Sequence, residues 1–272
     1  MIRSLSCLTV LFTLLCGIAY AENENISIQL MHSTYKLSGK NSFGTAFLMG
    51  EPLPDNPKRG HIVLITAAHV LEKMSGNEAI LHLRRPTGDS YKRVPFSIPI
   101  RHEDKELWTK HPKVDVAAMR IAIPEEVKTT LLPTTLLAND DILSQLEIRP
   151  GDELLVLGYP YGAEGNEAGF PILRSGRIAS YPLLPTATTK TFLLDFEIFQ
   201  GNSGGPVFFQ QDFRRIGGKP KTGDFRIVLG LVLRFNKKVT RIIYCAILSP
   251  TTSTKGESHG QKNIKSRTLS EF

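Results

Sequence analysis

Cysteine is scarce in this chain, and the positions of the few cysteines exclude a disulfide in the body of the protein. Cys7 and Cys16 fall near the N-terminus, and of the three cysteines only Cys245 lies further along. A single thiol cannot form an intrachain bridge, so the fold must rest on a hydrophobic core. Cys245 stands in an apolar run and is expected to be a buried free thiol.

Long hydrophobic runs are also lacking, except for one at the N-terminus. Residues 5–18 are largely apolar, Arg3 precedes them, and Ala-Tyr-Ala follows at 19–21. This pattern predicts a signal peptide over residues 1–21, because a membrane span needs about 20 apolar residues. We therefore expect an exported protein, secreted or periplasmic, with no membrane span after the signal is removed.

Helical periodicity is rare, and short strand-like stretches replace it. They are rich in Ile, Val, Leu and Phe and are separated by clusters of Gly, Pro and Asn. Such stretches are typical of strands. They occupy residues 26–30, 42–49, 61–66, 79–84, 91–100 and 115–123, then 153–158, 171–180, 191–199, 205–209, 225–234 and 240–248.

This arrangement predicts an all-β fold of two packed six-stranded antiparallel β-barrels. The first barrel is expected at about 26–123 and the second at about 151–248. Residues 124–150 form a crossover, and one or two helical turns are expected after residue 67. The polar residues 249–272 lack apolar periodicity and are predicted to be disordered.

Clusters of His, Cys, Asp and Glu at metal-ligand spacing are lacking, so we expect no metal and no cofactor. The net charge is +7, with 33 Lys and Arg against 26 Asp and Glu. A basic surface favours weak binding to anionic surfaces, with a merely solvated surface as the alternative. No nucleic-acid motif accompanies these charges, and no nucleic-acid partner is expected.

The segment 201–206, GNSGGP, is the most informative stretch of the chain. Glycines allow positive φ and a close backbone approach, so Ser203 can be held with its hydroxyl exposed. The amides of Gly201 and Ser203 can then point at one position and form an oxyanion hole. The structural alternative is a glycine-rich hairpin turn.

A serine nucleophile needs a base, and a histidine base needs a carboxylate that orients it. His69 ends the apolar run 62–65 in the sequence ITAAHV, unlike the other histidines, which lie in polar or mixed settings. Asp115 lies inside the apolar run VDVAAM, where a charge must be paired. Asp195 is the only comparable acid, and its place near the serine favours a structural role.

TAAHV, DVA and GNSGGPV, in this order, resemble the trypsin-like serine proteases of the chymotrypsin fold. The resemblance covers about residues 42–248. Within this family the chain is similar to the secreted bacterial branches of the glutamyl-endopeptidase and HtrA type, but without the PDZ domain of the HtrA-type enzymes. The resemblance implies a secreted serine endopeptidase that acts on protein or peptide substrates. Ser203 would be the nucleophile, His69 the base and Asp115 the orienting carboxylate.

Two alternatives use the same residues differently. GxSxG is also the nucleophile elbow of α/β-hydrolases, but that fold orders its residues serine, acid, histidine. After Ser203 only His259 follows, in a polar tail. The second alternative is a trypsin-like fold that serves as a secreted binding or adhesion module with little or no proteolysis.

The resemblance places a substrate pocket around Glu197, Ile198, Leu233 and Ile242. Glu197 at its floor would favour Arg or Lys before the scissile bond, unless strand alternation turns it away. The bulky Leu233 and Ile242 would narrow the pocket toward small apolar side chains.

Asn202 stands where animal members of the family carry an aspartate that pairs with a freed N-terminal ammonium. A neutral amide cannot offer that charge partner. We therefore expect the oxyanion hole to form from local packing of the loop.

Overall fold

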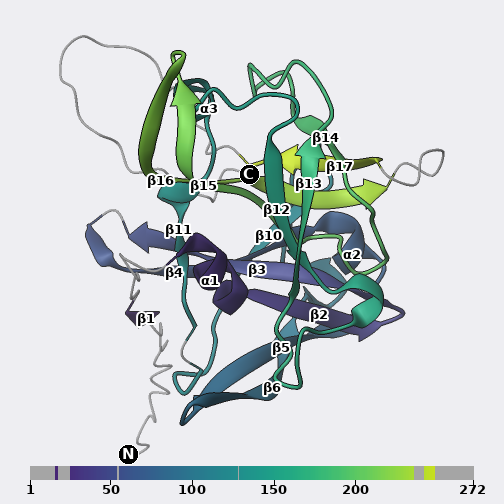
Figure 1. Cartoon of the computed structure of the whole chain (residues 1–272). Coiled ribbons are helices and arrows are strands. Elements are labelled where there is room, and N and C mark those ends of the chain that lie inside the picture. The colour runs from purple at the N-terminus through teal and green to yellow at the C-terminus, as the bar shows by residue number, and fades with distance from the viewer. Residues whose placement is uncertain (1–15, 18–24, 54, 128, 236–241, 249–272) are drawn as a thin grey trace, which may run out of the picture.

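The computed structural model describes residues 16–17, 25–53, 55–127, 129–235 and 242–248 (Figure 1). Most of the predicted signal peptide and the whole predicted tail, 249–272, lie outside the described residues. In Figure 1 the first half of the chain, in purple and blue, lies below the second half, in green and yellow.

The first half forms a nine-stranded sheet whose main path runs β6-β5-β2-β3-β4-β10-β9. Two short strands lie off this path: β1 pairs with β4, and β11 pairs with β3 in parallel. The sheet consists of β1 (Cys16–Gly17), β2 (Thr34–Lys40), β3 (Ser42–Leu53), β4 (Asn56–Ala67), β5 (Ser75–Thr87), β6 (Ser90–Pro99), β9 (Thr109–Lys110), β10 (Val116–Ile121) and β11 (Leu132–Pro133). Among the described residues, no ladder joins β6 to β9, so the predicted six-stranded closure is not seen in this half.

The second half forms a closed six-stranded antiparallel barrel in the order β12-β13-β14-β17-β16-β15. Its strands are β12 (Glu153–Gly158), β13 (Ile172–Ile178), β14 (Thr191–Asp195), β15 (Pro206–Ile216), β16 (Lys219–Phe235) and β17 (Ile242–Ile247). The predicted fold class is confirmed, because the chain is mostly antiparallel β-structure with one six-stranded ring.

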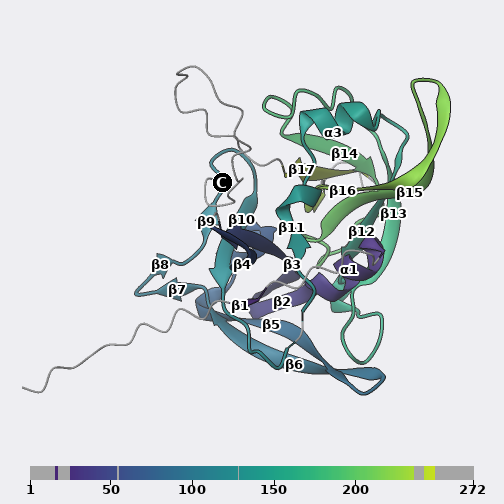
Figure 2. The ribbon, with the colours of Figure 1, turned by 90° about the vertical axis from the view of Figure 1, so that its left-hand side faces the viewer.

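The ends of β15 and β16 extend beyond the barrel as a long hairpin. Its turn is formed by Gly217 and Gly218, both with positive φ. Figure 2 shows this hairpin projecting from the second half, on the opposite side from the small two-stranded sheet of β7 (Arg101–His102) and β8 (Lys105–Glu106). Polar residues cover most of the hairpin, and the sequence pattern did not predict it.

The described residues form three α-helices: α1 (Ile26–Ser33), α2 (Ala68–Glu72) and α3 (Asp140–Gln145). Two short 3-10 helices, η1 (Thr134–Leu136) and η2 (Pro160–Gly162), complete the elements. Helix α2 was predicted as one or two helical turns, and this prediction is confirmed. Among the described residues, no helix is long and apolar enough to cross a membrane.

The prediction of a strand at residues 26–30 is wrong, because α1 begins there. The side chain of Asn25 accepts a hydrogen bond from the amide of Ser27 at 2.8 Å and caps the helix. Ile26 and Leu30 are fully buried, and they lie four residues apart on one helical face. The sequence ISIQL over residues 26–30 alternates apolar and polar residues, which is the pattern of a half-buried strand.

The two halves share one hydrophobic core. Leu64 and Phe47 of the first sheet belong to the same buried cluster as Phe208 and Leu231 of the barrel. A second cluster fills the barrel and includes Cys245, which is fully buried as a free thiol. Burial raises the pKa of the Cys245 thiol, because the thiolate would lose its hydration there.

Candidate active site

The register of two strands brings His69 and Asp115 together. β4 and β10 are antiparallel, and Val116 at the start of β10 pairs with Ala67 at the end of β4. Asp115 immediately precedes Val116, and His69 lies two residues after Ala67. The carbonyl oxygen of Asp115 accepts a hydrogen bond from the amide of Ala68 at 3.2 Å, which continues the ladder by one step.

Both carboxylate oxygens of Asp115 bind His69. Oδ1 accepts the backbone amide of His69 at 2.9 Å, and Oδ2 lies 2.6 Å from its ring Nδ1. The two side chains are only 16% and 13% exposed, respectively. Because an ionised carboxylate can only accept, the proton of the neutral imidazole lies on Nδ1. The lone pair of Nε2 is then available as a base.

Ser203 lies in the loop that connects β14 to β15, and this loop is fastened to the first sheet. The carbonyl oxygen of Ser203 accepts the amide of Thr45 at 2.9 Å. The hydroxyl of Thr45 donates to the carbonyl oxygen of Gly201 at 2.7 Å. One residue of β3 therefore holds the loop on both sides of Asn202.

Close backbone contacts place the Ser203 loop beside the start of α2. A Cβ added to Gly204 would lie 3.1 Å from the amide nitrogen of Ala67, two residues before His69. A Cβ added to Gly44 would lie 3.0 Å from the carbonyl oxygen of Ser203 and 2.8 Å from a methyl group of Val70. The structure therefore brings the three predicted site residues to one region, where the two halves meet.

The amides of the Ser203 loop fall into two groups. Those of Asn202, Gly204 and Gly205 donate to backbone carbonyl oxygens. Within the described part of the chain, no hydrogen bond uses the amides of Gly201 and Ser203. Gly201 has φ +100°, and a Cβ there would overlap with the carbonyl oxygen of Tyr159. Two amides are thus left for an external acceptor at a position that requires glycine.

The residues predicted to form a pocket differ in their surroundings. Glu197 is exposed, as is Asp195, whereas Phe196 between them is buried. This alternation turns Glu197 away from the barrel interior. It therefore favours the alternative in which Glu197 is turned away from the pocket over the one in which it forms the pocket floor. Leu233 is 5% exposed, and Ile198 is partly buried against the barrel core. The backbone of Ile242 pairs with Asp195, and its side chain lies outside the described residues.

Two further side chains beside the loop were not singled out from the sequence. Tyr161 is 72% exposed, and its ring stacks on Phe199 with 4.9 Å between the centroids. On the barrel side, the guanidinium of Arg174 lies 5.0 Å from the centroid of Phe199. Its Nη1 is buried and has no hydrogen-bond partner among the described residues. An isolated arginine or tyrosine carries no motif, so only the fold reveals these positions.

His111 holds the segment that leads to Asp115. Its ring Nδ1 accepts the amides of Lys113 and Val114, each at 3.1 Å. Burial lowers the pKa of His111, and the charges of Lys190 and Lys113 lower it further. Only the neutral ring can accept these two bonds, so protonation removes them.

We expect the stability contributed by His111 to be lost in acid. Because its folded pKa is lowered, the contribution is fully present above the unfolded value of about 6.5 and is lost as the pH falls through the folded pKa. An asparagine offers an acceptor that does not titrate, so His111→Asn should flatten the dependence of the urea unfolding midpoint on pH between about 7 and 4. Equal slopes for both proteins would contradict this role. His82, whose pKa is also lowered, by burial and by Lys36 and Arg93, is common to both proteins.

Comparison with solved structures finds several serine proteases to which the chain is similar. The Rv3671c protease of M. tuberculosis, in its active form, is 20% identical, with a TM-score of 0.43 over 91% of this chain and 89% of that one. A serine endoprotease from Yersinia pestis is 13% identical, with a TM-score of 0.45 over 82% and 62%. The thermostable serine protease AL20 from an extremophilic microorganism is 13% identical, with a TM-score of 0.45 over 80% and 92%.

No curated protein matches the sequence. The trypsin-like peptidase domain, in contrast, matches residues 44–217, well over half of the chain. This range begins in β3, ends in the turn of the β15–β16 hairpin, and contains His69, Asp115 and Ser203. The chain is therefore a member of the trypsin-like peptidase domain family.

Proposed function

We propose that this protein is a serine endopeptidase that hydrolyses peptide bonds through His69, Asp115 and Ser203. One observation carries the proposal: Asp115 binds both the backbone amide and the ring Nδ1 of His69. This pair fixes the direction of the imidazole and leaves Nε2 as the base. Thr45 of β3 fastens the Ser203 loop to the first sheet through two hydrogen bonds.

The reaction would proceed through an acyl-enzyme. Ser203 Oγ attacks the scissile carbonyl carbon while His69 Nε2 takes its proton, and Asp115 stabilises the imidazolium that forms. The amides of Gly201 and Ser203 hold the negative oxygen of the tetrahedral intermediate. His69 then protonates the leaving amine, and water releases the acyl group by the same steps.

We propose a narrow, apolar pocket for the side chain before the scissile bond. The outward direction of Glu197 removes the acid that would have favoured Arg or Lys. Leu233, in the core cluster that both halves share, and Ile198, packed against the barrel core, would supply the apolar surface of the pocket. A peptide library varied at this position should show faster cleavage after small apolar residues than after basic ones. Faster cleavage after Arg or Lys would contradict the narrow pocket.

We also propose export through residues 1–21. The basis is the order of Arg3, the apolar run 5–18 and Ala-Tyr-Ala at 19–21. Expression of the full chain in a bacterial host should yield a processed protein outside the cytoplasm that begins at Glu22. An uncleaved chain in the cytoplasmic fraction would contradict this proposal.

A fluorophosphonate probe tests the proposed chemistry directly. It reacts with a serine only when a base and an oxyanion hole activate the hydroxyl. Mass spectrometry of the labelled chain should place the adduct on Ser203, and labelling should block cleavage of a casein substrate. A folded protein that is neither labelled nor active would instead favour the binding module.

A further inference from the structure

Arg84, in β5, is buried at 3% exposure and occupies the seam between the two halves. Its two terminal nitrogens bind oxygens from two segments that are distant from Arg84 in sequence, residues 31–34 and 159–169. Nη1 donates to the hydroxyl of Tyr159 at 3.3 Å and to the carbonyl oxygen of Gly169 at 2.9 Å, and Nη2 donates to the carbonyl oxygens of Met31 at 2.8 Å, His32 at 3.2 Å and Thr34 at 2.7 Å.

Two aromatic rings enclose the same guanidinium. Its central carbon lies 4.3 Å from the ring centroids of both Tyr35 and Phe170. Among the described residues, no carboxylate forms an ion pair with Arg84. The guanidinium of Arg84 is planar and carries several donors in fixed directions, which match the diverging carbonyl oxygens around it. A lysine ammonium does not offer donors in this arrangement. The site is therefore built around an arginine.

The segment that Arg84 holds is the loop after β12, residues 159–171. Lys36 and Arg93 add outer contacts, because both bind the carboxylate of Glu164 in this loop. Lys36 also donates to the carbonyl oxygen of Gly162 at 3.1 Å. Three cations of the first sheet thus fasten a loop that belongs to the second half.

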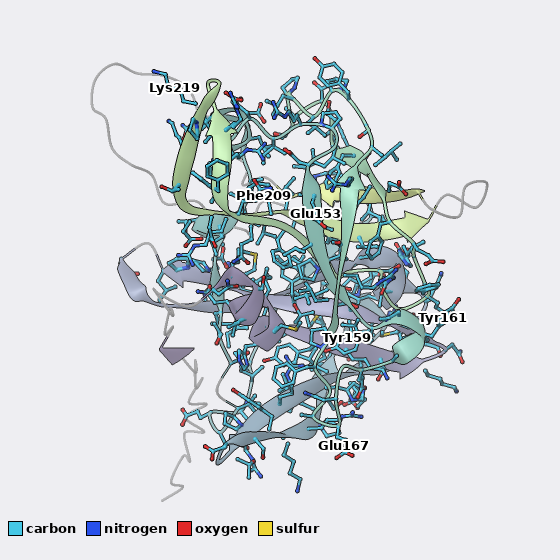
Figure 3. The ribbon with its side chains drawn as sticks, viewed as in Figure 1. Glu153, Tyr159, Tyr161, Glu167, Phe209 and Lys219 are labelled. Carbon is cyan, nitrogen blue, oxygen red and sulfur yellow. The ribbon has the colours of Figure 1, made fainter. Side chains whose placement is uncertain are left out.

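The loop of residues 159–171 lies directly against the Ser203 loop. The amide of Tyr161 donates to the carbonyl oxygen of Gln200 at 2.6 Å. The carbonyl oxygen of Tyr159 occupies the space that a Cβ on Gly201 would need. In Figure 3 Tyr159 lies over the strands of the first half, and Tyr161 lies nearer the edge of the molecule.

The backbone of Tyr161 is strained where this residue contacts the Ser203 loop. Tyr161 has φ +54°, a left-handed conformation that is unfavourable for a tyrosine. Such strain persists only where the surroundings impose it. Here the bond to Gln200, the stack on Phe199 and the anchored Tyr159 impose it from both sides.

We propose that Arg84 is a positioning residue for the oxyanion hole. It acts through Tyr159 and Tyr161, which set the orientation of the peptide groups at Gln200 and Gly201. The inference depends on the proposed peptidase function, since it concerns the amide of Gly201 as a donor. In this role the buried side chain of Arg84 keeps the amide of Gly201 directed at the substrate.

Arg84→Met keeps much of the volume and removes every donor. We expect kcat to fall by about 10- to 100-fold, approaching the loss seen when an oxyanion donor is removed. KM should stay within about threefold. Inhibition by a peptide boronate, whose adduct resembles the tetrahedral intermediate, should weaken by about the same factor as kcat/KM.

Arg214→Met is the matched control. Arg214 is also buried, at 6% exposure, binds the carbonyl oxygens of Leu146 and Glu147, and lies 4.9 Å from the ring centroid of Phe209. Unlike Arg84, it also pairs with a carboxylate, that of Asp152, at 2.6 Å. It anchors the base of the β15–β16 hairpin, whose end carries Lys219 in Figure 3, away from the Tyr161 turn. Because Arg214→Met leaves the Asp152 carboxylate without its partner, we expect this variant to lower the melting temperature at least as much as Arg84→Met while kcat stays unchanged.

Hydrogen exchange gives a readout that does not depend on turnover. Peptides that cover residues 159–171 and 199–203 should exchange faster in Arg84→Met than in Arg214→Met. If Arg84→Met does not fold, Tyr159→Phe removes the hydroxyl that accepts from Arg84 Nη1 and donates to the carbonyl oxygens of Thr34 and Gly169, and a several-fold fall in kcat is expected.

The outcomes separate this inference from the proposed function. A wild-type protein without Ser203-dependent cleavage would overturn the function itself. An active wild type with an equally active Arg84→Met, or with a fall in kcat that Arg214→Met matches, would overturn the role of Arg84 alone. A rise in KM at constant kcat would also overturn it, because that result indicates lost substrate binding.

Discussion

Ser203→Ala and His69→Ala are each expected to lower kcat/KM for a peptide substrate by on the order of 10⁴-fold or more. The first removes the nucleophile and the second removes its base. Neither change should unfold the protein, because Ser203 is anchored through its backbone carbonyl oxygen and His69 through its amide. Initial rates with a fluorogenic peptide, together with circular dichroism, measure both expectations.

Asp115→Asn is expected to have a similar effect for a different reason. The amide oxygen can still accept the backbone amide of His69, so the local geometry is kept. The amide nitrogen would then face Nδ1, and as a donor it favours the tautomer whose proton lies on Nε2. That tautomer cannot take a proton from Ser203.

The double variant Ser203→Ala with Asp115→Asn tests whether the residues act as a unit. If they do, the double variant should be about as slow as the slower single variant, because effects of cooperating catalytic groups are not additive. A Ser203→Ala protein that cleaves peptides at the wild-type rate would contradict the assignment, and so would full activity in His69→Ala.

The sequence predicts the fold class and the three site residues because each leaves a strong local pattern. Apolar runs of strand length with turn residues between them indicate β-structure. A histidine at the end of one such run and an aspartate inside another have few structural explanations. The strand register that joins them, with Val116 opposite Ala67, is visible only in the folded chain.

Other parts of the structure leave weaker patterns. Residues 26–30 alternate apolar and polar side chains, which indicates a strand, and five residues are too few to reveal the helix that Asn25 caps. The β15–β16 hairpin is polar on most positions, and only Gly217-Gly218 indicates its turn. Strand periodicity did not detect an element whose two faces are both largely solvated.

Arg84 illustrates why positioning residues escape a reading of the sequence. It belongs to a basic pair in a strand, which predicts a solvated charge. Its partners are mainly carbonyl oxygens and aromatic faces, which come from residues 31–35 and 159–170. Backbone oxygens have no residue type, so no spacing rule can anticipate such a site.

Gly204→Ala is expected to destabilise the protein more than any surface change. A Cβ at this position would overlap with the carbonyl oxygen of Thr45 and the hydroxyl of Thr66, and φ is +87°. The backbone cannot shift away, because the amide of Gly204 donates to the carbonyl oxygen of Val232 at 2.7 Å. We expect a loss of more than about 4 kcal/mol, a magnitude reached by only a few mechanisms.

Gly217→Ala separates the steric overlap from the cost of positive φ. Gly217 has φ +60°, and no atom lies within 4 Å of an added Cβ. Its alanine variant should lose only about 1 to 2 kcal/mol, the cost of a left-handed conformation. At roughly 2–4 °C per kcal/mol, Gly204→Ala should lower the melting temperature by at least about 8–16 °C, and Gly217→Ala by a few degrees. Similar melting temperatures for the two variants would show that the Ser203 loop can move off β3 and β4, contrary to the packing that places Ser203 beside His69.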